Sequence, residues 1–132
     1  MTKVLKTTFL IDGIIAVGFG IFSWLYPLKT FGSIISIPNE NLSLFLSLLS
    51  SLSLFYLLIG ITCLIGIKSN HPIAFWIAIV MLIRHLLEGL IKVADVGKSW
   101  LIANPYQDIA IHSIFIITYL IGIILLYKNN KS

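Results

Sequence analysis

Four long apolar blocks, separated by short segments rich in polar residues and proline, dominate the pattern of this chain. Each block reaches the roughly 20 residues that an α-helix needs to cross the hydrocarbon core of a bilayer. Pro27 ends the first block, and Pro72 falls in the first turn of the third, where proline is tolerated. The pattern predicts an all-α fold, a four-transmembrane-helix bundle with antiparallel neighbours, as a single integral membrane domain over 1–132. The helices are expected over about residues 7–26, 41–67, 72–96 and 106–127.

The two connections on the side away from the termini, residues 28–37 and 97–103, are also apolar. Backbone groups cannot lie unpaired in lipid. We therefore expect short interfacial helices in both connections, with their apolar side chains dipped into the membrane. The alternative is a pair of ordinary loops with aromatic anchors such as Trp100.

Composition supports a membrane location and excludes other classes. Hydrophobic residues make up 58% of the chain and charged residues 11%, whereas a soluble domain usually carries about 25% charged residues. The net charge of +4 comes from scattered basic residues without a Lys/Arg run, which argues against a nucleic-acid partner. A single cysteine, Cys63, excludes an intrachain disulfide and a cysteine zinc site.

The lysines near the helix ends predict how the chain is oriented. Cytoplasmic segments of membrane proteins carry an excess of Lys and Arg. With both termini inside, five lysines face the cytoplasm and three face the other side, which favours cytoplasmic termini in a plasma or inner membrane. The inner set is Lys3, Lys6, Lys68, Lys128 and Lys131, and the outer set is Lys29, Lys92 and Lys98.

Polar residues recur on one side of each predicted helix when they are placed at about 100° per residue. In the third helix Arg84, Glu88, Lys92 and Asp95 share a stripe, with His85 on its flank. Each of the other helices has a set of polar or small residues on one side. In the first helix the set is Thr8, Asp12, Ala16, Phe19 and Ser23, and in the second it is Ser43, Ser47, Ser50 and Ser51. In the fourth helix the set is Asp108, His112, Phe115, Tyr119 and Gly122. A bundle can gather these faces in its middle. The residues predicted to bind a ligand or to carry protons are Asp12, Arg84, Glu88, His112, Tyr119, Ser50 and Ser51.

A purely structural interpretation of this polar seam stays open. Arg84 and Glu88 lie one turn apart and can neutralise each other on their own helix, and small or hydroxylated residues are common where membrane helices meet. Ionisable residues inside a membrane nevertheless favour a functional role. His85 is interpreted as a packing residue. No metal site is expected, because His85 and His112 lie on different helices without a metal-binding spacing and His71 falls in a loop.

The layout resembles the DoxX-like and BphX-like groups of small four-helix bacterial membrane proteins. The resemblance rests on Tyr26-Pro27, on Ile37-Pro38-Asn39, on a Ser-rich second helix that runs through Gly60 and Gly66, and on Arg84-His85-x-x-Glu88-Gly89. It implies a bacterial inner-membrane protein. It further implies an accessory subunit of a quinone-linked or aromatic-degrading system.

Three function hypotheses follow. The first is a non-catalytic accessory subunit or binder of a small lipophilic molecule, a quinone or a lipid, with Arg84, Glu88 and His112 on its polar head. Its partners would be membrane lipids, and either another membrane protein or further copies of the chain, and no cofactor is required. The second is a proton-coupled exporter similar to the small multidrug-resistance family, with Asp12 as the working carboxylate. The third is an intramembrane acid–base enzyme that uses His112 and Glu88, although no motif assigns a catalytic residue.

Overall fold

The computed structural model describes residues 1–36, 40, 42–98, 101 and 103–129. Among the described residues, four helices are long and apolar enough to cross a membrane. The predicted four-helix all-α fold of a multi-pass membrane protein is therefore confirmed. The elements are α1 (Lys3–Leu25), α2 (Pro27–Gly32), α3 (Leu42–Lys68), α4 (His71–Ala94) and α5 (Pro105–Asn129).

Local sequence explains where two of the long helices begin. The hydroxyl of Thr2 accepts a hydrogen bond from the backbone N–H of Leu5 at 3.3 Å, so α1 starts four residues before the predicted boundary. Asn70 caps α4 in the same way, with its side-chain oxygen 3.2 Å from the N–H of Ile73. The predicted start of the second helix at Asn41 lies outside the described residues.

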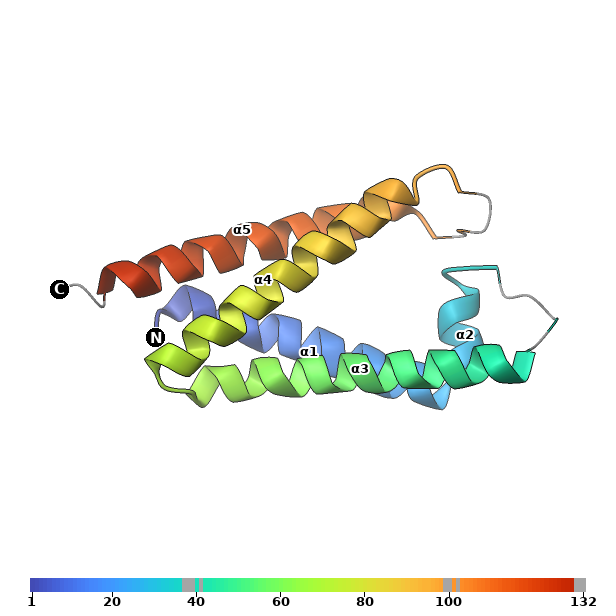
Figure 1. The fold of residues 1–132 in the computed structure, drawn as a ribbon, viewed down its shortest axis with the longest axis horizontal. Coiled ribbons are helices and arrows are strands. Elements are labelled where there is room, and N and C mark those ends of the chain that lie inside the picture. Colours follow the sequence, from blue (N-terminus) through green and yellow to red (C-terminus); the bar gives the residue numbers. More distant parts are fainter. Residues whose placement is uncertain (37–39, 41, 99–100, 102, 130–132) are drawn as a thin grey trace.

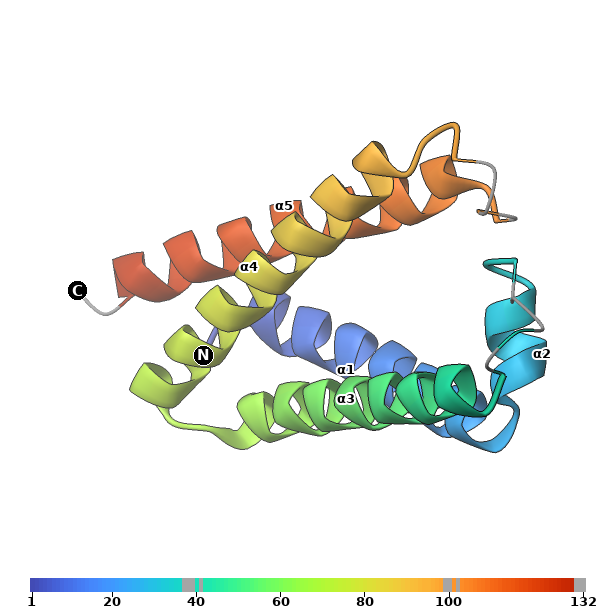
Figure 2. The same cartoon turned by 45° about the vertical axis from the view of Figure 1, so that its right-hand side comes forward.

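The long helices form two pairs, α1 with α3 and α4 with α5. Both termini and the α3–α4 connection lie at one end of the molecule, and α2 lies at the other (Figure 1). Near the termini the pairs meet through contacts such as Phe9 with Tyr119, whose ring centroids are 5.8 Å apart. Toward α2 the pairs diverge in both ribbon views (Figure 2). The bundle is thus closed at the terminal end and wedge-shaped toward α2.

The two apolar connections meet across the wide end. The predicted short helix is present in the first connection, as α2. The second connection instead forms turns over 95–97 in its described part, followed by an isolated antiparallel bridge between Leu101 and Ile35. A backbone hydrogen bond of 3.2 Å from Ala103 to Ile34 adds to this link. The anchor residue Trp100 and the segment 37–39 lie outside the described residues.

The α1–α3 pair is packed backbone against backbone at glycines. A Cβ atom added to Gly20 would lie 2.7 Å from the backbone nitrogen of Leu57, and one added to Gly60 would lie 2.6 Å from the backbone nitrogen of Val17. Such distances leave no room for any side chain, as at the small-residue interfaces of membrane helices. These contacts fix which face of α3 turns inward.

The predicted inward face of α3 is wrong. The buried residues of α3 include Ser53, Gly60 and Cys63, whereas Ser47 and Ser51 are exposed. The physical reason is that glycine permits the close approach to α1. A serine hydroxyl, in contrast, can face lipid after bonding to its own helix, as the Ser51 hydroxyl does by donating to the Ser47 carbonyl at 3.1 Å.

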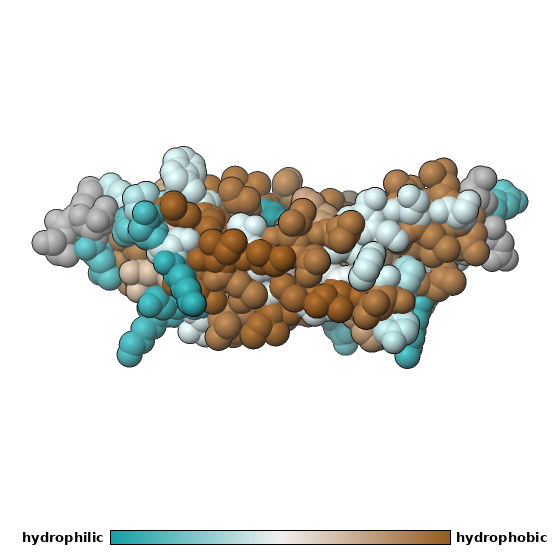
Figure 3. Space-filling view, turned by 90° about the horizontal axis from the view of Figure 1, so that it is seen from below, coloured by the Kyte–Doolittle hydropathy of each residue, from teal (hydrophilic) through white to brown (hydrophobic). Residues whose placement is uncertain are grey.

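The outward faces of the helices are apolar, as a lipid-facing surface requires. Leu10, Ile14, Ile21 and Leu90 all have more than 40% of their surface exposed. On the face shown in Figure 3, hydrophobic residues cover most of the middle, and the hydrophilic residues gather toward the two ends. On α4, Leu86, Leu90 and Val93 are exposed, whereas Leu82 packs against the buried core.

Candidate functional site

Asp12 of α1 is the centre of a polar cluster inside the bundle. Its side chain is almost fully buried, with 1% of the residue exposed. Its carboxylate accepts hydrogen bonds from Arg84 Nη2 at 3.2 Å and from Tyr119 Oη at 2.8 Å, and His85 Nε2 lies 3.0 Å away. Cys63 Sγ of α3 approaches to 3.7 Å. One carboxylate therefore links all four long helices, and its charge is compensated by a neighbouring guanidinium.

Glu88 forms the second half of the cluster, one turn from Arg84 along α4. Its carboxylate lies 3.5 Å from Arg84 Nε and 3.6 Å from His112 Nδ1. The hydroxyl of Tyr56 donates to it from α3 at 3.4 Å. Arg84 thus lies between two carboxylates. Its Nε atom is nevertheless buried and lacks a hydrogen-bond partner in the described structure. The Glu88 carboxylate is close enough to Nε for an ion pair, but the two groups are not aligned for a hydrogen bond.

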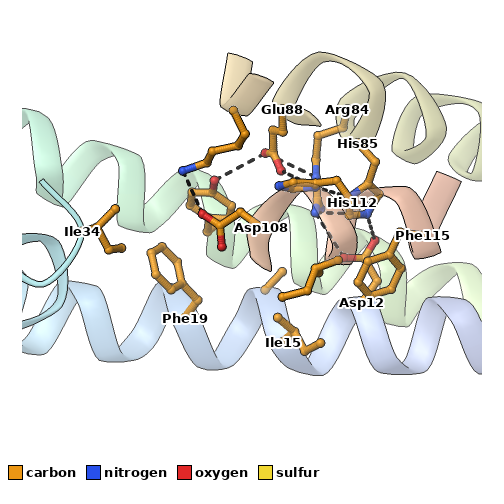
Figure 4. Close-up of a pocket in the computed structure, with 14 residues that line it drawn as sticks. Asp12, Ile15, Phe19, Ile34, Arg84, His85, Glu88, Asp108, His112 and Phe115 are labelled. Atoms are coloured by element: carbon orange, nitrogen blue, oxygen red, sulfur yellow. Dashed lines mark hydrogen bonds and ion pairs between the residues drawn. The ribbon is translucent and has the colours of Figure 1, made fainter. Parts of the chain in front are cut away.

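The two histidines of the cluster face each other, with 2.9 Å between His85 Nδ1 and His112 Nδ1. An ionised carboxylate can only accept, so His85 is assigned a proton on Nε2 that it donates to Asp12. In the neutral ring Nδ1 then carries a lone pair, and His112 Nδ1 supplies the proton between them. Arg84 Nη2, which can only donate, also lies 3.2 Å from His85 Nε2 and is assigned to Asp12. Glu88, His112, His85 and Asp12 form one continuous chain of contacts (Figure 4).

A cavity of about 220 Å³ lies beside this chain. The side chains of Arg84, Glu88 and His112 form its polar wall, and Phe19 and Ile111 belong to its apolar part. In Figure 4, Phe19 and Ile34 lie on the side of the cavity toward the wide end of the bundle, away from Arg84 and His85. The cavity therefore combines charged groups with an apolar surround, inside the part of the protein that spans the membrane.

A further ion pair lines the cavity. Lys92 of α4 lies 3.1 Å from Asp108 of α5. Asp95, the last residue of the polar stripe, lies at the C-cap of α4, in agreement with its interpretation as a helix-end residue. The stripe thus contributes Arg84, Glu88 and Lys92 to the cavity.

Five of the seven predicted site residues come together in the cluster, and two do not. Ser50 donates to the Leu46 carbonyl of its own helix at 2.9 Å, and Ser51 likewise bonds to its own helix. Neither serine lines the cavity. The residues that the structure brings together are Asp12, Arg84, Glu88, His112 and Tyr119.

Sequence reasoning missed three members of the cluster, of which His85 is the most important. His85 is 1% exposed and stacks on Phe115 with 4.6 Å between ring centroids. A signal was present, because the buried stripe Ala74, Ala78, Met81 and His85 follows helical spacing. The other two missed residues are Tyr56 and Cys63 of α3. They face the cluster because the close glycine contacts with α1 determine the rotation of α3.

Comparison of the chain with protein-family models, with curated proteins and with solved structures gave no match. The fold and the polar cluster are therefore the basis for assigning a class of protein. The chain is a small multi-pass membrane protein whose four spans carry interlinked ionisable side chains in the bundle interior.

Proposed function

We propose that this protein binds a small lipophilic molecule, such as a quinone or a lipid, whose polar head enters the cavity beside Arg84. The observation that carries the proposal is the cavity itself, whose lining combines charged side chains such as Arg84 and Glu88 with apolar side chains such as Phe19 and Ile111. Ligand sites typically combine an apolar lining with a few polar groups that fix the orientation of the ligand.

Arg84 indicates which ligand chemistry fits. Its Nε is a buried donor without a hydrogen-bond partner among the described residues, and its Nη1 has only the sulfur of Met81, at 3.9 Å. A guanidinium carries five N–H donors and no acceptor. An acceptor oxygen on the ligand, as in a quinone carbonyl or a lipid head group, would bind at Nη1, because Nε is screened from the cavity and lies 3.5 Å from Glu88. Because donors already occupy the Asp12 carboxylate, we do not propose it as the open substrate site of an exporter.

The proposed role is that of a non-catalytic accessory subunit or ligand carrier in a bacterial inner membrane. The resemblance to DoxX-like proteins supports it through Arg84-His85-x-x-Glu88-Gly89, whose first, second and fifth residues take part in the cluster. The part of the resemblance that rests on Ile37-Pro38-Asn39 lies outside the described residues.

Filling the cavity should expel the ligand without disturbing the ion pairs. Ile111 and Ile117 of α5 are similarly exposed, at 48% and 56%, but Ile111 lines the cavity and Ile117, six residues further along the helix, does not. Native mass spectrometry of the protein in mild detergent should show a retained lipophilic molecule that Ile111→Phe loses and Ile117→Phe keeps. Arg84→Leu should release it as well, and Lys6→Leu, which removes a cation outside the cavity, should not. Equal retention by all four variants would refute the proposed site.

We further propose that the termini face the cytoplasm, since the lysine distribution favours this orientation. Ser33 and Ser69 lie at opposite ends of the bundle, and Cys63 is 0% exposed and shielded from labels. A membrane-impermeant maleimide added to intact cells stripped of any outer membrane should label Ser33→Cys. It should label Ser69→Cys only after the membrane is opened. The reverse pattern would show that the termini lie outside.

A further inference from the structure

Three potential metal ligands converge at the cavity. One nitrogen from each of His85 and His112 and one carboxylate oxygen of Glu88 all lie within 4.8 Å of one another. The two Nδ1 atoms are 2.9 Å apart, and His112 Nδ1 is 3.6 Å from Glu88 Oε2. Ligand atoms bound about 2.0–2.1 Å from a metal ion lie roughly 2.9–3.4 Å from each other at octahedral or tetrahedral angles. Small side-chain rotations therefore suffice to place these atoms around one ion.

The surroundings of His85 match those of a metal-binding histidine. Such a histidine usually donates its second ring N–H to a carboxylate, which orients the ring and raises its basicity. His85 Nε2 lies 3.0 Å from the Asp12 carboxylate, and Tyr119 and Arg84 hold that carboxylate in place. The opposite nitrogen, Nδ1, then presents its lone pair toward His112.

The charge balance of the cluster also calls for a cation. Asp12 and Glu88 bring two negative charges and Arg84 brings one positive charge, while Lys92 and Asp108 cancel each other. With both histidines neutral, the cluster keeps one uncompensated negative charge inside the membrane, which is costly. A cation at the histidine pair would remove this charge, and that cation is either an additional proton or a metal ion.

We propose that His85 Nδ1, His112 Nδ1 and a Glu88 oxygen bind a divalent first-row transition metal ion. Imidazole together with carboxylate suits ions such as Zn²⁺, Fe²⁺ and Co²⁺. His112 would carry its proton on Nε2 in the bound form, which leaves Nδ1 free for the ion. Three protein ligands leave a coordination position open. This inference goes beyond the lipophilic-ligand proposal and does not depend on it.

The test is a metal titration of the full chain in mild detergent after treatment with a chelator. Zn²⁺ should bind at one ion per chain by elemental analysis, and Co²⁺ should give a visible absorption band. Glu88→Gln and His112→Gln should each weaken binding at least about tenfold. His71→Gln is the matched control, because it removes an imidazole that lies at the terminal end and contacts the Leu126 carbonyl. It should leave the affinity unchanged.

A second measurement requires no variant of the cluster. Pulsed EPR of the wild-type protein loaded with one equivalent of Cu²⁺ should show two coordinated imidazoles. The proposal would be overturned by the absence of saturable binding at one ion per chain, or by an EPR signal without two imidazole nitrogens. Affinity for Zn²⁺ that is equal in His112→Gln and wild type would also overturn it. Ile117→Phe, a substitution on α5 outside the cavity, should not alter metal binding. Absence of metal binding would leave the lipophilic-ligand proposal standing, because that proposal is tested by ligand retention in native mass spectrometry.

Discussion

Replacement of Asp12 by asparagine is expected to destabilise the folded protein by about 3–5 kcal/mol, because removal of one partner leaves the other charge of a buried ion pair uncompensated. Asparagine keeps the shape of the side chain, so the loss comes from the charge. It weakens the contacts of the carboxylate with Arg84, His85 and Tyr119 together. Equilibrium unfolding in mixed detergent micelles measures the change.

Asp95→Asn is the matched control for this prediction. Asp95 lies at the C-terminal end of α4, outside the cluster, and is only partly buried. The same chemical change should cost less than about 1 kcal/mol there, as at most surface positions. Equal effects of the two substitutions would show that the buried network around Asp12 contributes no special stability.

Gly20→Ala is expected to have the second large effect, a loss of about 1–3 kcal/mol or more from overpacking. The new Cβ would lie 2.7 Å from the Leu57 nitrogen and 2.9 Å from the Ser53 carbonyl oxygen. Both atoms belong to the backbone of α3, so no side-chain rotation can relieve the clash and the helices must separate. The same unfolding measurement in micelles reports the loss.

Gly18 provides the control on the same helix. A Cβ added there meets nothing within 4 Å, and alanine favours a helix over glycine by roughly 0.5–1 kcal/mol. Gly18→Ala should therefore be neutral or slightly stabilising. If Gly18→Ala and Gly20→Ala behave alike, the close approach of α1 and α3 is wrong.

The hydrophobic pattern was sufficient to predict the four spans and the inward faces of two of them. In α1 the buried residues include Thr8, Asp12 and Ser23, and in α5 they include Phe115 and Tyr119, as the polar stripes predicted. In both helices, side chains that are costly to expose to lipid, such as Asp12 and Tyr119, lie on one side. The placement of these few polar residues therefore indicates their rotation.

The same reasoning failed for α3 because its serines and its glycines favour different rotations. Serines at 43, 47 and 51 line up well, but a hydroxyl can satisfy itself on its own helix and need not face the interior. Glycine spacing carries the stronger constraint, since Gly60 determines the distance to α1. Steric fit between two helices is a pairwise property, which a pattern read along one helix does not contain.

The composition of the site was only partly predictable for a related reason. Asp12, Arg84 and Glu88 were identified because charges inside a membrane must turn inward. His85 was assigned to packing, although it stacks on Phe115 and also reaches Asp12 and His112. The contact of His85 with His112 depends on how α4 and α5 pair, and no sequence spacing encodes it.

A double-mutant cycle between Asp12 and Arg84 tests the central claim, that ionisable groups from separate helix pairs meet inside the bundle. The cycle compares the unfolding free energies of wild type, Asp12→Asn, Arg84→Gln and the double variant. The 3.2 Å contact between these side chains predicts a coupling energy of at least about 1 kcal/mol, since contacting residues are not additive. Additivity within about 0.5 kcal/mol is the behaviour of distant sites and would contradict the account.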